Sequence, residues 1–302
     1  MRWFKDANYD FMTKRRLVML VSILPIIVGL ISIAVKGGLE TSIDFAGGML
    51  LEVGFADPVP VQDVRAVLDR TGFTGAEVTN FGGSHDVLIQ IKHIGQAAET
   101  AARVEEALKT ELGSHTVDVR RVETVGPKVG SELKSAAFWA VIWSCLGIIA
   151  YVSWRFQFRM AVAAIIALIH DVFFTLGLFS LANKEISIAV IAAILTIIGY
   201  SLNDTIVVFD RVRENLQARR GREGFMSLVN LSVNQTLSRT IITGLTTILS
   251  LVVLILVAGP VIRDFAIALL IGMVVGTYSS VYIASALLIE WDLWRNKHRK
   301  VA

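Results

Sequence analysis

Three ionisable side chains lie inside or beside long apolar runs, where such groups are rare. Asp171 falls near the middle of one run, Asp204 lies in the next, and Arg239 opens the run after that. An ionisable group in the hydrocarbon of a bilayer is costly unless it is paired or hydrated, so one that is kept there is a functional candidate. A carboxylate held beside a cation in a low-dielectric site can take up and release a proton. These residues therefore predict proton transfer within a membrane.

Asp204 and Arg239 are predicted to lie at similar depth. The run Ile206–Phe209 separates Asp204 from the charged residues beyond it, which places this carboxylate about 8–10 Å inside the membrane if the segment is helical. Arg239 enters the following run from the same side, so the two side chains could form an ion pair. Polar neighbours could hold water around Asp204, or could coordinate a sodium ion in place of a proton. They are Ser201, Asn203 and Thr205.

These charges also have structural interpretations. Asp204 and Arg239 could be a buried structural pair, and Asp171 could brace a helix interface. His170 is adjacent to Asp171, so in a helix it points about 100° away. A packing or hydrogen-bonding role is preferred for His170 over a place in the proton path.

The sequence does not favour an enzyme. An intramembrane aspartyl protease could use Asp171 and Asp204 as a dyad that shares a proton, but helix counting places the two carboxylates at different depths. The exported segment shows no nucleophile–base pair and no metal-ligand cluster, and the chain lacks a nucleotide-binding Gly-x-x-x-x-Gly-Lys-Ser/Thr loop. We therefore expect no catalytic residue, no metal site and no cofactor.

The candidate residues lie in a chain with six apolar runs long enough to cross a bilayer. Its 302 residues are 54% hydrophobic and only 18% charged, which is more apolar than an ordinary soluble domain. A membrane is therefore the expected solvent. The first run is longer than that of a signal peptide and precedes no small-residue cleavage site, so it is interpreted as an uncleaved anchor. The predicted spans are 17–35, 136–154, 160–181, 186–209, 240–258 and 265–289.

Basic residues mark one side of this membrane. They cluster before the first run, between the second and third, between the fourth and fifth, and after the sixth, whereas the other short loops contain only Lys184 and Arg263. By the positive-inside rule both termini are cytoplasmic and the long segment after the first span is exported. This placement explains the net charge of +3 without a nucleic-acid partner. The predicted organisation is a cytoplasmic N-terminus (1–16), a transmembrane helix (17–35), an exported domain (36–130), a bundle of transmembrane helices 2–6 (131–290) and a cytoplasmic tail (291–302).

The exported segment reads as a small α+β domain. Alternating and helical patterns predict strand, helix, strand, strand, helix and strand in that order, which is the ferredoxin-like pattern. A domain of this kind often acts as a binding element or a lever. The predicted elements are 49–55, 59–71, 76–81, 86–92, 96–112 and 116–125.

Two motifs are specific enough to suggest a family. Residues 42–48 read Ser-Ile-Asp-Phe-Ala-Gly-Gly, and residues 198–215 read Ile-Gly-Tyr-Ser-Leu-Asn-Asp-Thr-Ile-Val-Val-Phe-Asp-Arg-Val-Arg-Glu-Asn. In the first motif, Gly47 and Gly48 allow a tight turn where the chain leaves the membrane, and Asp44 can accept backbone hydrogen bonds. Phe45 completes this motif, which is interpreted as a structural hinge.

With Ser238-Arg239-Thr240 and the six-span layout, these motifs closely resemble the SecD/SecF family of bacterial protein-export subunits, on its SecF side. The resemblance implies an inner-membrane protein of the resistance–nodulation–division (RND) superfamily, forming half of a twelve-span bundle with SecD. It implies association with the SecYEG channel and use of the proton motive force to draw preproteins outward after SecA has pushed them. It also implies proton coupling by Asp204 and Arg239. Asp171 is a further candidate because of its place in an apolar run, not because of the resemblance.

Two other functions stay open. A proton-coupled RND exporter of small molecules would share the intramembrane charges, but such proteins usually carry both halves and large exported domains on one chain. A scaffold that only stabilises SecD would need no proton chemistry at all. Replacing Asp204 with Asn separates these functions, because a scaffold would be unaffected.

Overall fold

Within the part of the chain that the structure describes, six helices are long and apolar enough to cross a membrane. The computed structural model describes residues 7–81, 83–92, 96–112, 117–219 and 224–299. The helices are α1 (Arg15–Val35), α5 (Pro127–Arg155), α6 (Phe158–Leu181), α7 (Ile188–Arg219), α8 (Phe225–Val257) and the pair α9 (Pro260–Ser279) and α10 (Ser285–Arg299). The six predicted spans are therefore confirmed as helices. Parts of the predicted terminal segments, 1–6 and 300–302, lie outside the described residues.

The helices extend beyond the apolar runs that predicted them. α7 continues ten residues past Phe209, and α8 begins at Phe225, well before Thr240. The extensions stay helical because their polar residues pair across the two helices: Asn215 donates to the Ser232 hydroxyl at 2.8 Å. A π-helical turn, η1 (Ser280–Ala284), joins α9 to α10 without breaking the span.

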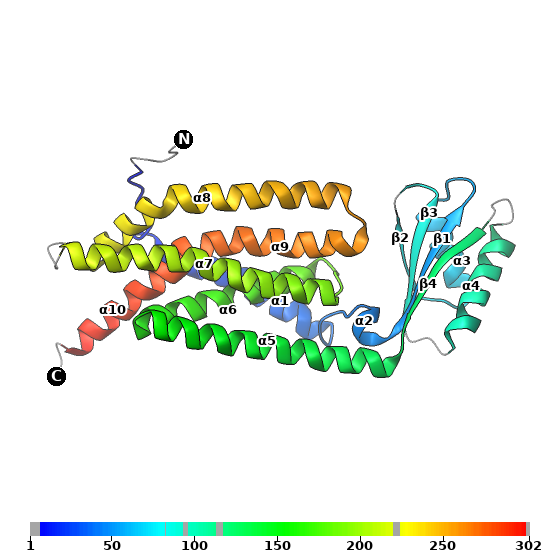
Figure 1. The fold of residues 1–302 in the computed structure, drawn as a ribbon, viewed down its shortest axis with the longest axis horizontal. Helices are drawn as coiled ribbons and strands as arrows, with labels where there is room; N and C mark the ends of the chain where they lie inside the picture. The colour runs from blue at the N-terminus through cyan, green and yellow to red at the C-terminus, as the bar shows by residue number, and fades with distance from the viewer. Residues whose placement is uncertain (1–6, 82, 93–95, 113–116, 220–223, 300–302) are drawn as a thin grey trace.

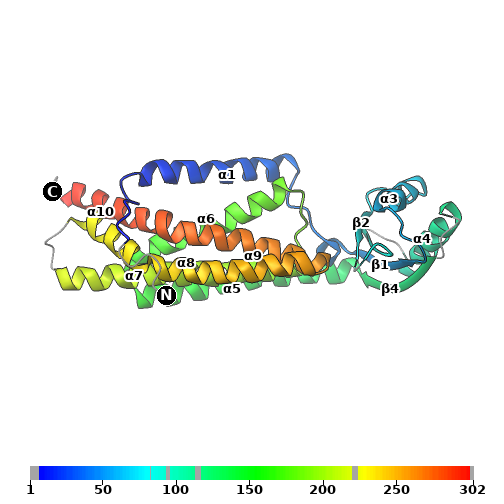
Figure 2. The same ribbon diagram turned by 90° about the horizontal axis from the view of Figure 1, so that it is seen from above.

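The bundle has an inner and an outer set of helices. In the most apolar stretch of α6, of α7 and of α9–α10, half or more of the residues are buried. The corresponding stretches of α1, α5 and α8 are largely exposed. Figure 2 shows α1 along one side of the bundle and α5 along the other. The three inner helices are the ones that carry Asp171, Asp204 and the glycine pair Gly272 and Gly276.

A small α+β domain follows α1 and stands at one end of the bundle, while the end of α10 lies at the opposite end (Figure 1). Its elements are β1 (Gly48–Phe55), α3 (Val61–Arg70), β2 (Glu77–Asn80), β3 (Asp86–Lys92), α4 (Ala97–Glu111) and β4 (Val117–Val125). The strands form one sheet in the order β2-β3-β1-β4, with antiparallel neighbours throughout. The first residue of the predicted last strand, Thr116, lies outside the described residues.

One face of the sheet is covered by helices and the other is turned toward the bundle. Met49, Leu51 and Val53 alternate on β1 and pack into a core with the apolar residues of α3 and α4. These two helices lie on the side of the sheet away from the membrane helices (Figure 1). Polar and charged side chains of the open face, such as Gln90 and Glu123, therefore look toward the ends of α7 and α9.

A tight connection joins the bundle to this domain. A one-turn helix, α2 (Ile43–Ala46), leads into Gly47, whose φ of +75° favours glycine. The Asp44 carboxylate accepts a hydrogen bond from the backbone N–H of Ile188 at 2.9 Å, at the start of α7. On the return path, Pro127 occupies the first turn of α5 directly after β4. The domain is thus attached by two short connections rather than a long linker.

Candidate functional site

Asp171 is the centre of a buried hydrogen-bond network. Its carboxylate has no exposed surface, contacts His170 Nδ1 at 2.9 Å, and accepts a hydrogen bond from Ser201 Oγ on α7 at 2.5 Å. The other ring nitrogen of the histidine, Nε2, lies 2.6 Å from Ser22 Oγ on α1. Three helices, α1, α6 and α7, therefore meet at this one pair. The preferred packing or hydrogen-bonding role of His170 now has a definite partner, although the two side chains were expected to point apart.

Asp204 lies on the same helix as Ser201, one turn further along. Only 3% of the residue is exposed, and its Oδ2 atom has no hydrogen-bond partner. A buried carboxylate oxygen without a donor is unusual, because its desolvation is not offset. Asp204 therefore has a buried carboxylate oxygen that is free to accept a proton or a hydrogen bond from a new donor.

The expected ion pair between Asp204 and Arg239 is not formed in this structure. Both residues are described, and their charged atoms do not come within the 4.0 Å that defines an ion pair. The Arg239 side chain is instead exposed on α8, although its charge is close enough to act on Asp204 through space. An arginine on an outer helix has room to swing toward solvent or a partner, and helix counting, which fixes only depth, could not show this.

The predicted supporting residues divide between the two faces of α7. Ser201 and Thr205 are buried on the side of Asp204, whereas Asn203 is exposed. Two glycines of α9 form a close packing face against α7: a Cβ on Gly272 would overlap Ile197, and one on Gly276 would lie 3.0 Å from the Ser201 Cβ. α9 therefore presses on α7 at the level of the network and holds Ser201 toward Asp171.

Further polar atoms without partners surround this level of the bundle. Within the part of the chain that the structure describes, the hydroxyl oxygens of Thr240, Thr277 and Ser279 are buried and unpaired, like Asp204 Oδ2. They belong to α8 and α9, two of the helices that pack on α7. Such atoms can hydrogen-bond water that carries protons.

Charges at the terminal end of the bundle are paired. Asp210, near the end of the apolar run of α7, lies 3.4 Å from Arg155 and 3.3 Å from Arg213. Glu290 on α10 binds Arg15 and Arg16 at the start of α1. These contacts fix helix ends and engage both carboxylates.

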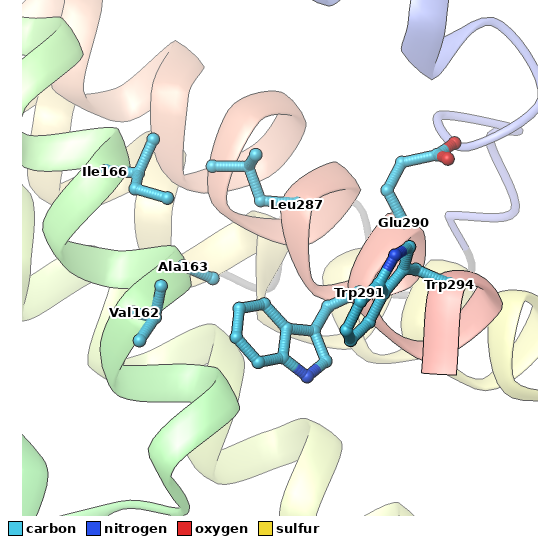
Figure 3. Close-up of a pocket in the computed structure, with 7 residues that line it drawn as sticks. All are labelled: Val162, Ala163, Ile166, Leu287, Glu290, Trp291 and Trp294. Atoms are coloured by element: carbon cyan, nitrogen blue, oxygen red, sulfur yellow. The ribbon is translucent and has the colours of Figure 1, made fainter. Parts of the chain in front are cut away.

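Hollows of the described structure lie outside the network. One of about 310 Å³ between α6 and α10 is lined by apolar side chains and the tryptophans Trp291 and Trp294, with Glu290 at its edge (Figure 3). Asp171, Asp204 and Arg239 do not line it. Another, of about 540 Å³, lies between the open sheet face and the bundle. Beside it the Lys92 ammonium, at the end of β3, pairs with Glu185 in the loop before α7.

The described residues contain no group of three or more His, Cys, Asp or Glu side chains placed to hold a metal ion. Asp171 is engaged by His170 and Ser201 rather than by Asp204. The carboxylate dyad that a protease would need is therefore not assembled in this structure.

Comparison with known proteins decides the family. Residues 104–294 match the family described as protein export membrane protein SecD/SecF, C-terminal. A protein translocase subunit SecF from Desulfurispirillum indicum is 44% identical over 287 residues, covering 93% of this chain and 91% of that protein. The chain belongs to the SecD/SecF family. A second SecF, from Vibrio alginolyticus, is 42% identical and covers 94% of this chain and 90% of its own length.

A solved member of the SecD/SecF family shares the fold. The crystal structure of SecDF from Thermus thermophilus, a translocon-associated membrane protein, superposes with a TM-score of 0.84 at 39% identity and covers 96% of this chain. SecDF in a super-membrane-facing form gives a TM-score of 0.75 at 38% identity over 99% of this chain. This chain spans only about two fifths of those SecDF chains, 39% and 41%.

Ser22 is the member of the network that sequence reasoning missed in this SecF-family chain. It lies in the first apolar run, 148 residues from His170, and serine is common in membrane helices. The sequence does carry one signal for Ser22: it is a small polar residue within a mostly aliphatic run, and such residues often lie at helix contacts. Its partner could be known only from the packing of α1 on α6.

Proposed function

We propose that this chain is the SecF-type subunit of a Sec translocase accessory complex in the bacterial inner membrane. It pairs with SecD, associates with the SecYEG channel, and uses the proton motive force to draw preproteins outward after SecA has pushed them through. The observation that carries the proposal is Asp204, a buried carboxylate with an unpaired oxygen in the longest motif of the family resemblance.

The surroundings of Asp204 support proton binding rather than a fixed structural pair. Its expected partner, Arg239, is on the adjacent helix but is not bonded to it. The unpaired hydroxyls of Thr240, Thr277 and Ser279 can line a hydrated path to it. Protonation of Asp204 removes its charge and with it the attraction of Arg239, so α7 and α8 can change their relative position. Asp171 is the next station along this path.

The α+β domain receives this movement. α7 begins at Ile188, whose N–H is held by Asp44 in the connection that leads into β1. A shift of α7 therefore moves the connection that leads into the α+β domain. The domain alternates between gripping and releasing an emerging polypeptide. The gradient supplies enough work, because one charge that crosses 100 mV gains about 2.3 kcal/mol.

The membrane arrangement is part of the same proposal. Both termini are cytoplasmic and the α+β domain is exported, in keeping with the basic loops at the terminal end of the bundle. The element order and the strand order β2-β3-β1-β4 support a ferredoxin-like domain. The exposed faces of α5 and α8 are suited to cover by SecD, as the other half of an RND-type bundle, and by lipid.

The test is translocation of a preprotein into inverted membrane vesicles, with and without an imposed proton gradient. Asp204→Asn is compared with the native chain at matched levels, and Asp210→Asn, a boundary carboxylate on the same helix, is the control. We expect Asp204→Asn to lose the gradient-dependent part of export and to keep the ATP-driven part. Export at the native rate under a gradient would show that the chain is a scaffold. If the native chain shows gradient-dependent export with a sodium gradient and no proton gradient, sodium is the coupling ion.

A further inference from the structure

The pair His170–Asp171 has a hydrogen-bonding pattern that leaves one proton position open. With a proton on Nδ1, His170 donates to Asp171 Oδ1, while Ser201 donates to Asp171 Oδ2 and Ser22 donates to His170 Nε2. In this state every polar atom of the pair has a partner, and the pair carries one net negative charge. Among the described residues, His170 is the only basic side chain within ion-pair distance of Asp171.

One added proton can be accommodated without breaking the network. It binds His170 Nε2, which then donates to Ser22 Oγ, and the Ser22 hydroxyl turns away to another acceptor. An acceptor is at hand in the hydroxyl of Tyr278 on α9, which donates to the Val18 carbonyl at 3.3 Å, one turn before Ser22 on α1. The protonated pair is neutral overall, which removes an isolated charge from the membrane interior.

This switch of Ser22 occurs on the helix that carries the α+β domain. α1 is largely exposed, and its main packing partner is α6. The two backbones approach closely at Gly29 and Gly177, where a Cβ on Gly29 would overlap the backbone of Gly177. Ser22 lies two turns, about 10 Å, to one side of this contact. The domain lies on the other side of the contact, beyond Val35.

We propose that His170, Asp171, Ser22 and Ser201 form a second proton-binding station in the bundle, and that it couples proton uptake to the position of α1. His170 holds the proton and Ser22 is the positioning residue that reports it to α1. Ser201 connects the station to Asp204, which lies three residues further along α7 on the same buried side. α1 then acts as a lever about the Gly29–Gly177 contact. This inference rests on the proposed function of the chain in proton-driven export.

The titratable groups that face this station come from three helices. Asp171 is on α6 with His170, Tyr278 is on α9, and Asp204 is one turn from Ser201 on α7. α1 contributes only the Ser22 hydroxyl. A change in the pH profile of the station can therefore be separated from Asp204 by replacing His170 alone.

The experiment measures gradient-dependent export in inverted vesicles at a constant proton gradient over a series of pH values. His170→Gln keeps hydrogen bonding and removes the titratable ring, and Ser22→Ala removes one hydroxyl. Ser32→Ala is the matched control, because Ser32 pairs with Ser180 at 2.9 Å across the same two helices with no titratable group. We expect His170→Gln to lower gradient-dependent export at least tenfold and to remove one limb of the pH profile. Ser22→Ala should lower it a few-fold, and Ser32→Ala should keep the native rate and profile.

Assembly with SecD, measured by co-purification, shows whether each variant folds. If His170→Gln does not assemble, the pH profile of Ser22→Ala decides. An unchanged pH profile in the variants that assemble would overturn the proposal. Asp204→Asn separates the two ideas: if it abolishes gradient-dependent export while His170→Gln does not, the second station is wrong and the proposed function stands. If neither Asp204→Asn nor His170→Gln lowers gradient-dependent export, the proposed function is wrong, and the second station is wrong with it.

Discussion

Single hydrogen bonds in this chain join segments that are far apart in sequence. Asp44 accepts from the N–H of Ile188, at a separation of 144 residues. The N-terminus of a helix leaves backbone N–H groups without intrahelical partners and carries a partial positive charge, so a carboxylate there is stabilising. This one side chain therefore begins α7 and also holds the connection between α1 and the α+β domain.

Replacing Asp44 with Ala should lower the free energy of unfolding by about 1 kcal/mol, the usual value of a lost N-terminal cap. The reason is that the N–H of Ile188 loses its acceptor. Asp44→Asn keeps an oxygen acceptor without the charge and should lose less. Thermal unfolding of the purified chain in detergent measures both. Equal losses in the two variants would show that the charge, not the hydrogen bond, is what matters.

Residue-level prediction from the sequence succeeded for residue types and failed for contacts. The composition of the apolar runs identified Asp171 and Asp204 as intramembrane charges, because a carboxylate there stands out against aliphatic neighbours. The contact between His170 and Asp171 was not predicted, because adjacent residues in a helix point about 100° apart. The imidazole ring is nevertheless long enough for its Nδ1 atom to reach the Asp171 carboxylate. The pair of Asp204 and Arg239 was expected from depth alone, which does not fix side-chain direction.

Close helix contacts in the bundle depend on small residues. Gly29 and Gly177 bring α1 and α6 together, and Gly272 and Gly276 bring α9 onto α7. Apolar side chains gain little from leaving lipid for protein, so membrane helices rely on such close packing and on polar contacts between them. The α1–α6 contact combines both, with Ser22 and Ser32 hydrogen-bonded to α6 on either side of the glycines.

Replacing Gly29 with Ala should destabilise the chain by about 1–3 kcal/mol, the usual cost of overpacking. The added methyl group would overlap the backbone of Gly177 and force the helices apart. Gly147→Ala on α5 is the control, because a Cβ there meets nothing within 4 Å. It should be neutral or stabilising, by up to about 1 kcal/mol. The measurement is thermal unfolding in detergent, and similar losses in both variants would contradict the close contact.

The helices themselves were largely predictable from apolar length, and their ends were not. The runs up to Phe209 and from Thr240 predicted spans, but α7 and α8 continue as a polar helical pair. Polar extensions carry no hydropathy signal and are stabilised by contacts such as Asn215 with Ser232. The π-helical turn at Ser280–Ala284 leaves no mark in the apolar pattern either.

At the scale of the whole molecule, a few links seat the α+β domain on the bundle. They include the Asp44 cap on α7, a β-bridge between Thr41 and Ile186, and the ion pair of Lys92 with Glu185. The open face of the sheet is not packed against the bundle but encloses a hollow of about 540 Å³ with it. An arrangement with few links allows the domain to change its orientation, which a lever requires.

Glu185, which joins the α+β domain to the bundle through Lys92, should make the stability of the folded chain depend on pH. Burial raises the pKa of the Glu185 carboxyl above its ordinary value; Lys92 opposes this shift, and the nearby charges of Glu77 and Glu40 add to it. The folded protein therefore binds this proton more tightly than the unfolded chain. Its contribution to stability is present at low pH and is lost as the pH rises through the pKa of the folded state.

The native chain should thus gain stability relative to Glu185→Gln as the pH falls from about 8 to about 5, a range above the ordinary value for glutamate. Thermal unfolding of both proteins across this range measures the difference. Glu105→Gln is the control, because Glu105 pairs with Lys109 on the outer surface of α4. If the native and Glu185→Gln curves run parallel, the carboxyl does not titrate with folding. The ion pair with Lys92 would then be a surface contact whose contribution to stability does not change with pH.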